Sequence, residues 1–238
     1  MNTGFYKDLD TNFEQALEMS EREFAHDELV EMLKNGNIPQ KQIAAMKLDK
    51  IMNQGEADIL ISNLTGCDGK IREAVALRIN TFLKEHSELI RFFNKPKVFA
   101  DASVDINGNI CRLVIESVSI LKQNKDFTNA YLEEILSFIE DAFIELDKFI
   151  FRDKKYVINK QLFKLYWCLE ALKGFVLDIP FDKISPIIDR ASQEREYTIR
   201  EKAAQIISLL ASDTSANIRE RLEKDENYYV RNALKKHH

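Results

Sequence analysis

One short pattern recurs along the chain and constrains its fold more than any other feature. It consists of an acidic residue, four spacer residues, a branched Ile or Val, and in most copies an Arg directly after it. The clearest copy starts at Glu194 and continues with Ile199, Arg200 and Ala203. Copies that recur at intervals of about 30 to 50 residues indicate two-helix repeats that stack on one another.

The copies keep the acidic-to-branched interval, with one exception, and vary at the arginine. The copy at Ile71 has Gly66 in the acidic position, whereas Cys111 and Asn159 replace the arginine in two other copies. We therefore expect the array to be least regular between Phe127 and Leu172. The members of the repeat motif are Ile71, Arg72, Asp105, Ile110, Asp153, Ile158, Glu194, Ile199, Arg200, Asp225, Val230 and Arg231.

Each part of the motif has a physical role at the start of a second helix. The branched side chain anchors the helix in the core, and the small Ala pair after it lets a neighbouring backbone approach closely. The acidic residue caps the turn or pairs with the Arg of its own or the next repeat, which forms a ladder. The alternative is that Arg72, Arg200 and Arg231 bind phosphate. We expect the ladder, because the motif recurs where no ligand needs to lie.

The pattern resembles the HEAT repeat family, whose second helix commonly opens with an acidic residue, a short gap, Val-Arg and a small residue. The copy at Glu194 matches best, and the copy with Asp225, Val230 and Arg231 is second. The resemblance covers roughly Asn37 to Lys236. It implies an all-α fold, an α/α superhelix (a HEAT-like α-solenoid) of about six helix pairs. In such stacks the second helices line the concave side, which is the usual binding side.

The N-terminal part is expected to differ from this array. Apolar spacing over Asp10–Asn35 predicts one amphipathic helix with an acidic outer face, ended by Asn35-Gly36. Residues 1–36 would pack as this helix on a single continuous repeat domain over residues 37–238. A second helix is expected from Pro39 to Gly55, and a loop-rich connection between Pro96 and Gly108. The acidic face could bind a basic partner, although a solvated helix face explains most such runs.

Composition narrows the classes of function. The chain has 39 acidic and 34 basic residues, and its formal charge of -5 gives no general attraction to nucleic acid or anionic membrane. The scattered cysteines Cys67, Cys111 and Cys168 predict no metal site and a reducing, cytoplasmic location. We find neither a secretion signal nor an uncharged apolar run of about 18 residues. His237 and His238, native or the start of a tag, enter no functional argument.

The sequence contains no motif that points to catalysis. It has no Gly-rich phosphate loop, no GxSxG, no HExxH and no Cys/His pair, so we expect no enzyme and no cofactor. Two alternatives come from related helical stacks. A nucleic-acid-binding protein of the alkylpurine DNA glycosylase type would use a basic groove with aromatics, for which the chain offers Trp167, Glu170, Lys160, Lys164 and Arg112. The other is a bilin-lyase-like repeat protein, which no local feature selects.

A helical wheel identifies the residues expected to line the binding groove. If Ile158 and the leucines after it face the core, Lys160, Lys164 and Trp167 point the opposite way. An aromatic beside cationic side chains is typical of interaction hot spots, so we expect a scaffold or adaptor that binds a protein or peptide. In the alternative interpretation, Trp167 packs against a neighbouring helix. The expected groove residues are Lys160, Lys164, Trp167, Arg112, Glu116, Asn80 and Gln205.

Overall fold

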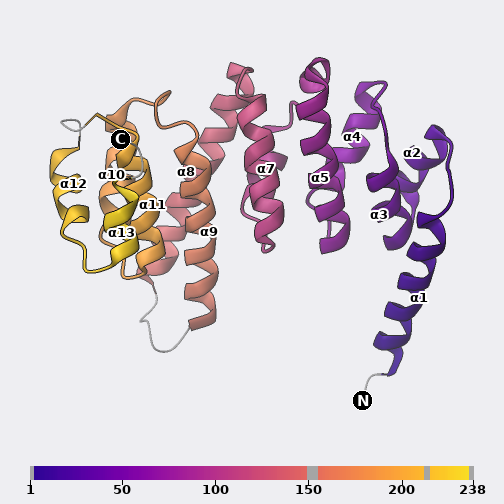
Figure 1. Cartoon of the computed structure of the whole chain (residues 1–238), viewed down its shortest axis with the longest axis horizontal. Coiled ribbons are helices and arrows are strands. Elements are labelled where there is room, and N and C mark those ends of the chain that lie inside the picture. The colour runs from indigo at the N-terminus through magenta and orange to yellow at the C-terminus, as the bar shows by residue number, and fades with distance from the viewer. Residues whose placement is uncertain (1–2, 149–154, 212–214, 236–238) are drawn as a thin grey trace. The chain divides into compact units, whose positions relative to one another are not determined.

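The computed structural model describes residues 3–148, 155–211 and 215–235 (Figure 1). Within these ranges every regular element is helical, with thirteen α-helices and one 3-10 helix, so the predicted all-α class is confirmed. Helix α1 (Thr3–Ser20) comes first, and six helix pairs follow it.

Each pair consists of a first and a second helix that follow one another in the chain. The first helices are α2 (His26–Asn35), α4 (Gln54–Ser62), α6 (Pro96–Ser103), α8 (Lys125–Asp147), α10 (Phe181–Ala191) and α12 (Ala216–Glu223). The second helices are α3 (Ile38–Lys47), α5 (Gly69–Glu85), α7 (Gly108–Leu121), α9 (Lys155–Lys173), α11 (Tyr197–Ser208) and α13 (Tyr228–Ala233). The 3-10 helix η1 (Ser87–Phe92) precedes α6.

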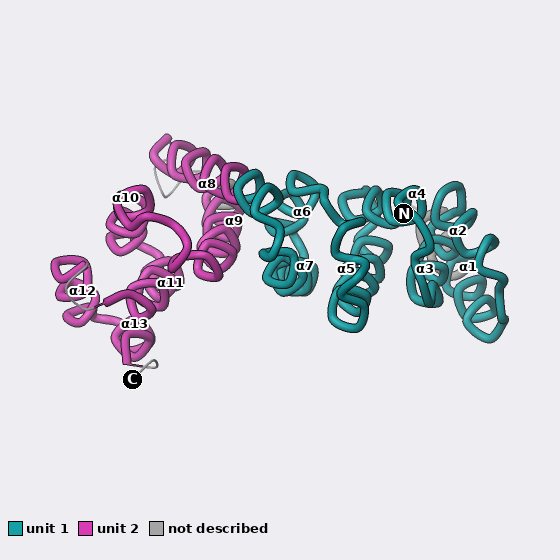
Figure 2. The backbone as a smooth tube through the Cα atoms, turned by 90° about the horizontal axis from the view of Figure 1, so that it is seen from above, with its two compact units in different colours: residues 1–131 teal, residues 132–238 magenta. Residues whose placement is uncertain are grey.

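The chain divides into two compact units, residues 1–131 (unit 1) and 132–238 (unit 2) (Figure 2). In unit 1, α1 packs on α3, α3 on α5 and α5 on α7. In unit 2, α9 packs on α11 and α11 on α13. The second helices therefore form a layer within each unit, with the first helices beside it. That residues 37–238 form one continuous domain stays a prediction.

The branched residues of the repeat motif anchor the second helices as expected. Ile71, Ile110, Ile158, Ile199 and Val230 are all buried. In α11, which packs between α9 and α13, Ala203 and Ala204 are also buried. Small side chains at this point allow two neighbouring helices to approach the α11 backbone closely.

Side-chain caps fix where several second helices begin. Asp68, Asn107 and Asn227 each accept a hydrogen bond from a backbone N–H of the first turn of α5, α7 and α13. Glu196 stands at the corresponding position before α11. Each of these four residues lies three positions before its Ile or Val anchor, so equivalent anchors enter the core at the same point of the first turn.

The N-terminal segment differs from the prediction of one helix over Asp10–Asn35. Helix α1 ends at Ser20 and α2 begins at His26. The separate start of α2 is stabilised by Glu28, whose carboxylate accepts the N–H of Ala25 at 2.9 Å. The predicted stop at Gly36 is confirmed, and a Cβ there would lie 2.4 Å from the Met32 carbonyl oxygen, so the close approach requires glycine.

Two further boundaries were predicted wrongly. Helix α3 ends at Lys47, and Gly55 lies inside α4, because Asn53 caps a new helix by accepting the N–H of Glu56. The stretch between Pro96 and Gly108 contains α6 rather than only loop. Pro96 is in the first turn of α6, where its fixed φ suits a helix and its missing N–H has no intrahelical partner to lose.

Candidate protein-interaction surface

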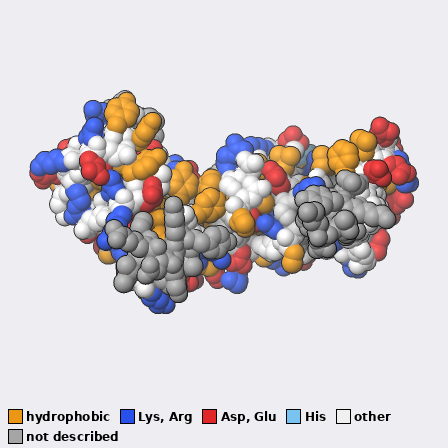
Figure 3. All heavy atoms as spheres, turned by 90° about the horizontal axis from the view of Figure 1, so that it is seen from below, with side chains coloured by type: hydrophobic (Ala, Val, Ile, Leu, Met, Phe, Trp, Pro, Cys, Tyr) orange, Lys and Arg blue, Asp and Glu red, His pale blue; other side chains and the backbone are white. Residues whose placement is uncertain are grey.

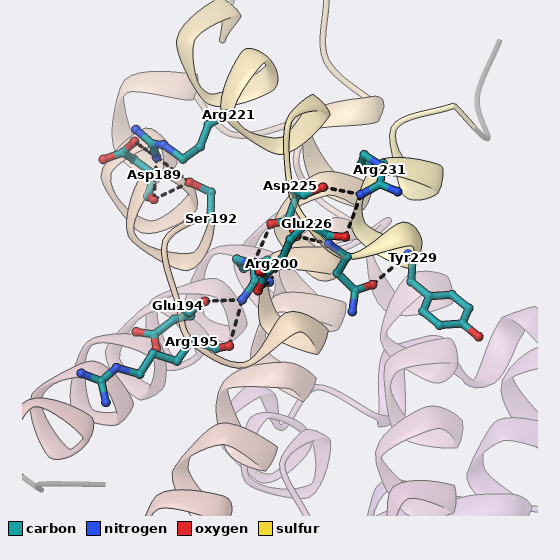
Figure 4. A network of polar contacts seen from close by, with 11 residues as sticks. Asp189, Ser192, Glu194, Arg195, Arg200, Arg221, Asp225, Glu226, Tyr229 and Arg231 are labelled. Atoms are coloured by element: carbon teal, nitrogen blue, oxygen red, sulfur yellow. Dashed lines mark hydrogen bonds and ion pairs between the residues drawn. The ribbon is translucent and has the colours of Figure 1, made fainter.

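The starts of α11 and α13 in unit 2 are joined by an arginine ladder, defined here as the Arg–Asp pairs between successive repeats (Figure 4). Arg200 Nε and Nη2 donate to the two carboxylate oxygens of Asp225 at 2.7 and 3.2 Å. Arg200 Nη1 donates to the carbonyls of Glu194 and Arg195 at 2.7 and 2.9 Å. Asp225 also accepts the N–H of Asn227 at 2.8 Å. The loops that lead into α11 and α13 are thus held by one guanidinium.

Unit 1 contains the same ladder, and the arginine lies six and five positions after the two carbonyls that it holds, as in unit 2. Arg72 donates to both carboxylate oxygens of Asp105 at 2.6 and 3.2 Å, and to the carbonyls of Gly66 and Cys67 at 2.7 and 3.0 Å. In the next repeat the thiol of Cys111 donates to the Asp105 carbonyl at 3.0 Å, which is the contact an arginine makes elsewhere. The predicted Arg–Asp pairing is confirmed for these residues.

The last copy repeats part of this arrangement. Arg231 Nη1 donates to the carbonyls of Asp225 and Glu226, as Arg200 does one repeat earlier (Figure 4). Asp153, the acidic member of the copy at Ile158, lies outside the described residues.

The charged side chains of the ladder are largely shielded from solvent, and each arginine hydrogen-bonds to its aspartate. The hydrogen bond that Arg200 donates to Asp225 raises the pKa of the Arg200 guanidinium. Burial opposes ionisation of Asp225, but the hydrogen bonds from Arg200 and from the Asn227 N–H hold the pKa of Asp225 below its ordinary value. Four of the five N–H donors of Arg72 and of Arg200 are engaged within the chain, so neither offers the donor pair needed to clamp a phosphate.

The three groove residues predicted in unit 1 differ in their exposure to solvent. Asn80 was expected to face a partner, but this is wrong: its side chain is buried, and Nδ2 donates to the Leu113 carbonyl and to Ser117 Oγ, both at 3.2 Å. The amide therefore joins α5 to α7. Arg112 and Glu116 are exposed as expected, and Glu116 pairs with Lys84 at 2.7 Å.

Two predicted groove residues of unit 2 are engaged with neighbouring helices. Lys164 is half-buried, and its Nζ lies 4.4 Å from the centre of the Phe138 ring of α8. Gln205 Oε1 accepts from Lys173 Nζ of α9 at 3.5 Å and from Lys202 Nζ of its own helix at 3.2 Å. Lys160 is exposed. Only part of the predicted cationic rim beside Trp167 is therefore presented to solvent by these described residues.

Trp167 lies in a shallow aromatic groove where α9 faces the start of α11. Phe163 and Tyr166 meet its ring edge-on, with ring-centroid distances of 6.1 and 5.3 Å. The indole Nε1 is buried, and it has no hydrogen-bond partner within the described chain. The groove measures about 450 Å³ and is lined by Asn159, Leu162, Phe163, Tyr166, Trp167, Glu196 and Thr198.

Three tyrosines extend this surface, and the sequence analysis missed them. Tyr197, Tyr228 and Tyr229 are 37%, 63% and 59% exposed. The Tyr229 ring lies 6.3 Å from that of Tyr197 and 5.6 Å from that of Tyr228. Tyr197 stands between Glu196 and Thr198, which both line the groove at Trp167. We call Phe163, Tyr166, Trp167, Tyr197, Tyr228 and Tyr229 the aromatic row.

Figure 3 shows the face at which α11 and α13 begin, and hydrophobic side chains gather there on unit 2 away from the atoms drawn in grey.

The positions of these tyrosines relative to the anchors could have identified them from the sequence. Tyr197 and Tyr228 stand two residues before the anchors Ile199 and Val230, and Tyr156 has the same position before Ile158. The helical wheels began at the anchors and therefore omitted the first residues of each second helix.

A cluster of charges, formed by the buried Lys202 and the half-buried Glu170 and Lys173, adjoins the aromatic groove at Tyr166. Lys202 Nζ donates to Glu170 Oε2 at 2.5 Å and lies 4.4 Å from the centre of the Tyr166 ring, and Lys173 also donates to Glu170. Burial opposes ionisation of Glu170, but the hydrogen bonds from Lys173 and Lys202 hold its pKa below the ordinary value. Burial likewise opposes the charge of Lys202, and the bond to Glu170 nevertheless raises its pKa. These charges fix Tyr166 between α9 and α11.

Among the described residues no group of three or more His, Cys, Asp or Glu side chains could hold a metal ion. No described helix combines the length and apolar character needed to cross a membrane.

Comparison with known proteins identifies structural similarity without a family. No family model matches the sequence, and no curated protein matches it. A designed armadillo repeat protein, YIII(Dq)4CqI, is similar at a TM-score of 0.48 and 11% identity, over 88% of this chain and 98% of its own. Two engineered proteins of the Northeast Structural Genomics Consortium, targets OR329 and OR366, are 13% identical, with TM-scores of 0.48 and 0.47. They cover 89% and 90% of this chain, and 94% and 96% of their own.

Proposed function

We propose that the protein is a non-enzymatic scaffold or adaptor that binds an extended segment of a partner protein along the aromatic row of unit 2. The observation that carries this proposal is the set of neighbouring exposed rings at Tyr197, Tyr228 and Tyr229, continuous with the groove at Trp167. Tyr and Trp are enriched at binding hot spots, because they contribute large contact area with few rotatable bonds.

The support around the row favours recognition by a rigid surface. The Arg200–Asp225 pair fixes the loops that lead into the helix starts at Tyr197 and Tyr228, and Lys202 of the Glu170–Lys202 pair contacts the Tyr166 ring. Rings that are already ordered before binding lose little conformational entropy when a partner covers them. The row crosses α9, α11 and α13, so an extended segment can contact several repeats at once.

The two enzyme-related alternatives receive less support from the described residues. A glycosylase-type site needs a carboxylate free to act on its substrate, whereas Glu170 is held by Lys173 and Lys202. Lys164 faces Phe138, and the ladder arginines Arg72 and Arg200 are paired with Asp, so these three cations are not free to bind a phosphate backbone. No described feature favours a bilin-lyase-like activity over binding.

The proposal can be tested by selecting partners from a library of displayed random peptides with the full chain as bait. A triple variant, Tyr197→Ala, Tyr228→Ala and Tyr229→Ala, removes the exposed rings from the two helix starts. Selected peptides should bind this variant at least about tenfold more weakly, since a hot-spot side chain contributes about 2 kcal/mol or more.

A matched control removes exposed apolar side chains elsewhere. Leu77→Ala with Leu177→Ala alters two exposed positions outside the aromatic row, and it should leave peptide affinity unchanged. Thermal unfolding of both variants checks that each remains folded. If the selected peptides bind the triple tyrosine variant as tightly as the unmodified chain, the aromatic row is not the binding surface.

A further inference from the structure

We propose a second docking surface, the groove between α1 and α2 in unit 1, which binds a basic amphipathic segment of a partner protein. This surface is independent of the aromatic row and has a different chemistry. The inference rests on where the chain places its negative charge and on the apolar side chains that the charge surrounds.

The net charge of the whole chain is concentrated in one stretch. Residues 11–35 contain seven acidic and two basic residues, and the rest of the chain contains 32 of each. The entire formal charge of -5 therefore belongs to the end of α1, the turn after it and α2. If the helix face were acidic only because it is solvated, the excess of negative charge would not need to be confined to this one stretch of the chain.

The acidic side chains surround an apolar floor. The groove measures about 630 Å³, and Met19, Phe24 and Met32 line it between the acidic residues Glu18, Asp27, Glu28 and Glu31. Met19 is buried, Phe24 and Met32 are half-buried, and all four acidic residues are exposed. Gln15, Arg22 and Gln40 complete the lining. Flexible methionines at a surface groove adapt to differently shaped apolar side chains.

The chain itself neutralises little of this charge. Glu28 accepts the N–H of Ala25, and Glu31 accepts from the amide of Asn35, so both make neutral hydrogen bonds. Arg22 stacks over the Phe24 ring at 5.1 Å. Within the described ranges no Lys or Arg forms an ion pair with Glu18 or Asp27. An incoming segment with Lys or Arg can therefore pair with carboxylates that are already in place.

These features select one kind of occupant. Apolar side chains at helical spacing would enter the floor, and Lys or Arg on the flanks would meet the rim, as in other helix-in-groove complexes. A second copy of this chain fits less well, because the rest of the chain carries balanced charge. We therefore assign the groove to a different, basic protein.

The experiment uses the full chain and three fluorescein-labelled peptides of about 14 residues. The first alternates Leu and Lys in an amphipathic helical pattern, the second replaces Lys by Glu, and the third replaces Leu by Ser. Fluorescence polarisation should detect saturable binding of the Leu/Lys peptide alone. Binding of the Ser/Lys peptide within threefold of the Leu/Lys peptide would show general charge attraction and would overturn the proposal.

Charge-matched variants locate the site. Glu18→Gln, Asp27→Asn and Glu31→Gln together should weaken binding of the Leu/Lys peptide about tenfold at low salt, because three rim carboxylates are lost. Glu85→Gln, Glu88→Gln and Asp101→Asn remove the same charge from exposed positions outside the groove, and they should change the affinity less than twofold. Equal effects of the two triple variants would refute the groove assignment.

Two further outcomes are informative. The triple tyrosine variant of unit 2 should bind the Leu/Lys peptide normally, which separates this surface from the aromatic row. If sedimentation shows concentration-dependent self-association that is lost in the groove variant, the occupant is a second copy, and the assignment to a basic partner is wrong.

Discussion

Units 1 and 2 build their second helices on the same ladder but place different side chains around it. Two residues before the anchor, unit 1 has Gly69 and Gly108, whereas unit 2 has Tyr197 and Tyr228. The ladder distances are nearly identical in the two units. Both units therefore share the geometry of the helix start. The residue two positions before the anchor differs between them, Gly in unit 1 and Tyr in unit 2, without a change in the ladder.

The layers of second helices differ as well. In unit 1 a buried polar side chain between α5 and α7 is the neutral amide of Asn80, which bonds to α7. In unit 2 it is the charged pair of Lys202 and Glu170, covered by Tyr166. Unit 2 thus places a charged cluster against Tyr166, one member of the aromatic row. The same repeat geometry can thus hold a neutral hydrogen-bonded contact between second helices, as in unit 1, or a charged pair packed against an aromatic side chain, as in unit 2.

The largest loss of stability is expected when a ladder arginine is removed, and comparing the two arginines tests whether the two ladders are equivalent. Arg72→Ala and Arg200→Ala should each destabilise the chain by about 3 kcal/mol, because a buried Asp and two carbonyls lose their donor. Urea unfolding followed by hydrogen exchange in each unit measures the loss. A difference above about 1 kcal/mol between the variants would break the comparison, since the contacts match.

The next effect concerns the polar groups inside the second-helix layers. Lys202→Ala should destabilise unit 2 by about 2 kcal/mol, since Glu170 loses its most buried partner but keeps Lys173. Asn80→Ala should destabilise unit 1 by about 1 kcal/mol, because only neutral hydrogen bonds are lost. The same unfolding measurements apply. An Asn80 variant as unstable as the Lys202 variant would contradict the distinction between the units.

The dependence on pH should also follow the charges of unit 2. The folded-state pKa values of Asp225 and Glu170 are lowered, so their contribution is present above the unfolded pKa of about 4. It is lost as pH falls through the lowered folded values. Unfolding between about pH 5 and pH 2.5 should therefore show declining stability, and Asp225→Asn should make the decline shallower. An unchanged pH profile in that variant would argue against a stabilising Asp225 carboxylate.

The smallest effect is expected at Glu194, the acidic member whose preceding repeat has Asn159 in the arginine position. Burial raises the pKa of the Glu194 carboxyl, so its folded form favours the proton and its contribution weakens as pH rises through the raised value. Glu194→Gln should accordingly stabilise the chain at neutral pH, by less than about 1 kcal/mol. Loss of stability in that variant at pH 7 would show that the ionised carboxylate is favourable in the fold.

The sequence was sufficient to predict the helix pairs, the buried anchors and the Arg–Asp contacts, because each depends on short intervals within the motif. It failed at Asn80, since a helical wheel assigns polar residues to solvent and cannot know that Leu113 and Ser117 offer partners across the interface. The break after Ser20 was missed for a similar reason: apolar spacing continues across it, and the decisive contact is the Glu28 carboxylate on the Ala25 N–H.

The candidate site was predicted only in part. Trp167 was identified because its position opposes the core stripe, and the structure places it in a groove with Phe163 and Tyr166. The tyrosines of the row were not, because their importance depends on rings from α11 and α13 meeting in space. Lys164 was assigned to the rim, but its contact with Phe138 involves a different helix that no single-helix wheel includes.

The ladder has a practical consequence for shortened forms of the protein. A chain cut after Lys224 would retain all of α12 and yet remove the carboxylate that holds Arg200, so damage would extend one repeat inward from the cut. A chain that ends a few residues later keeps that carboxylate. Safe truncation points in this molecule therefore lie beyond the acidic residue that follows a first helix, rather than directly after that helix.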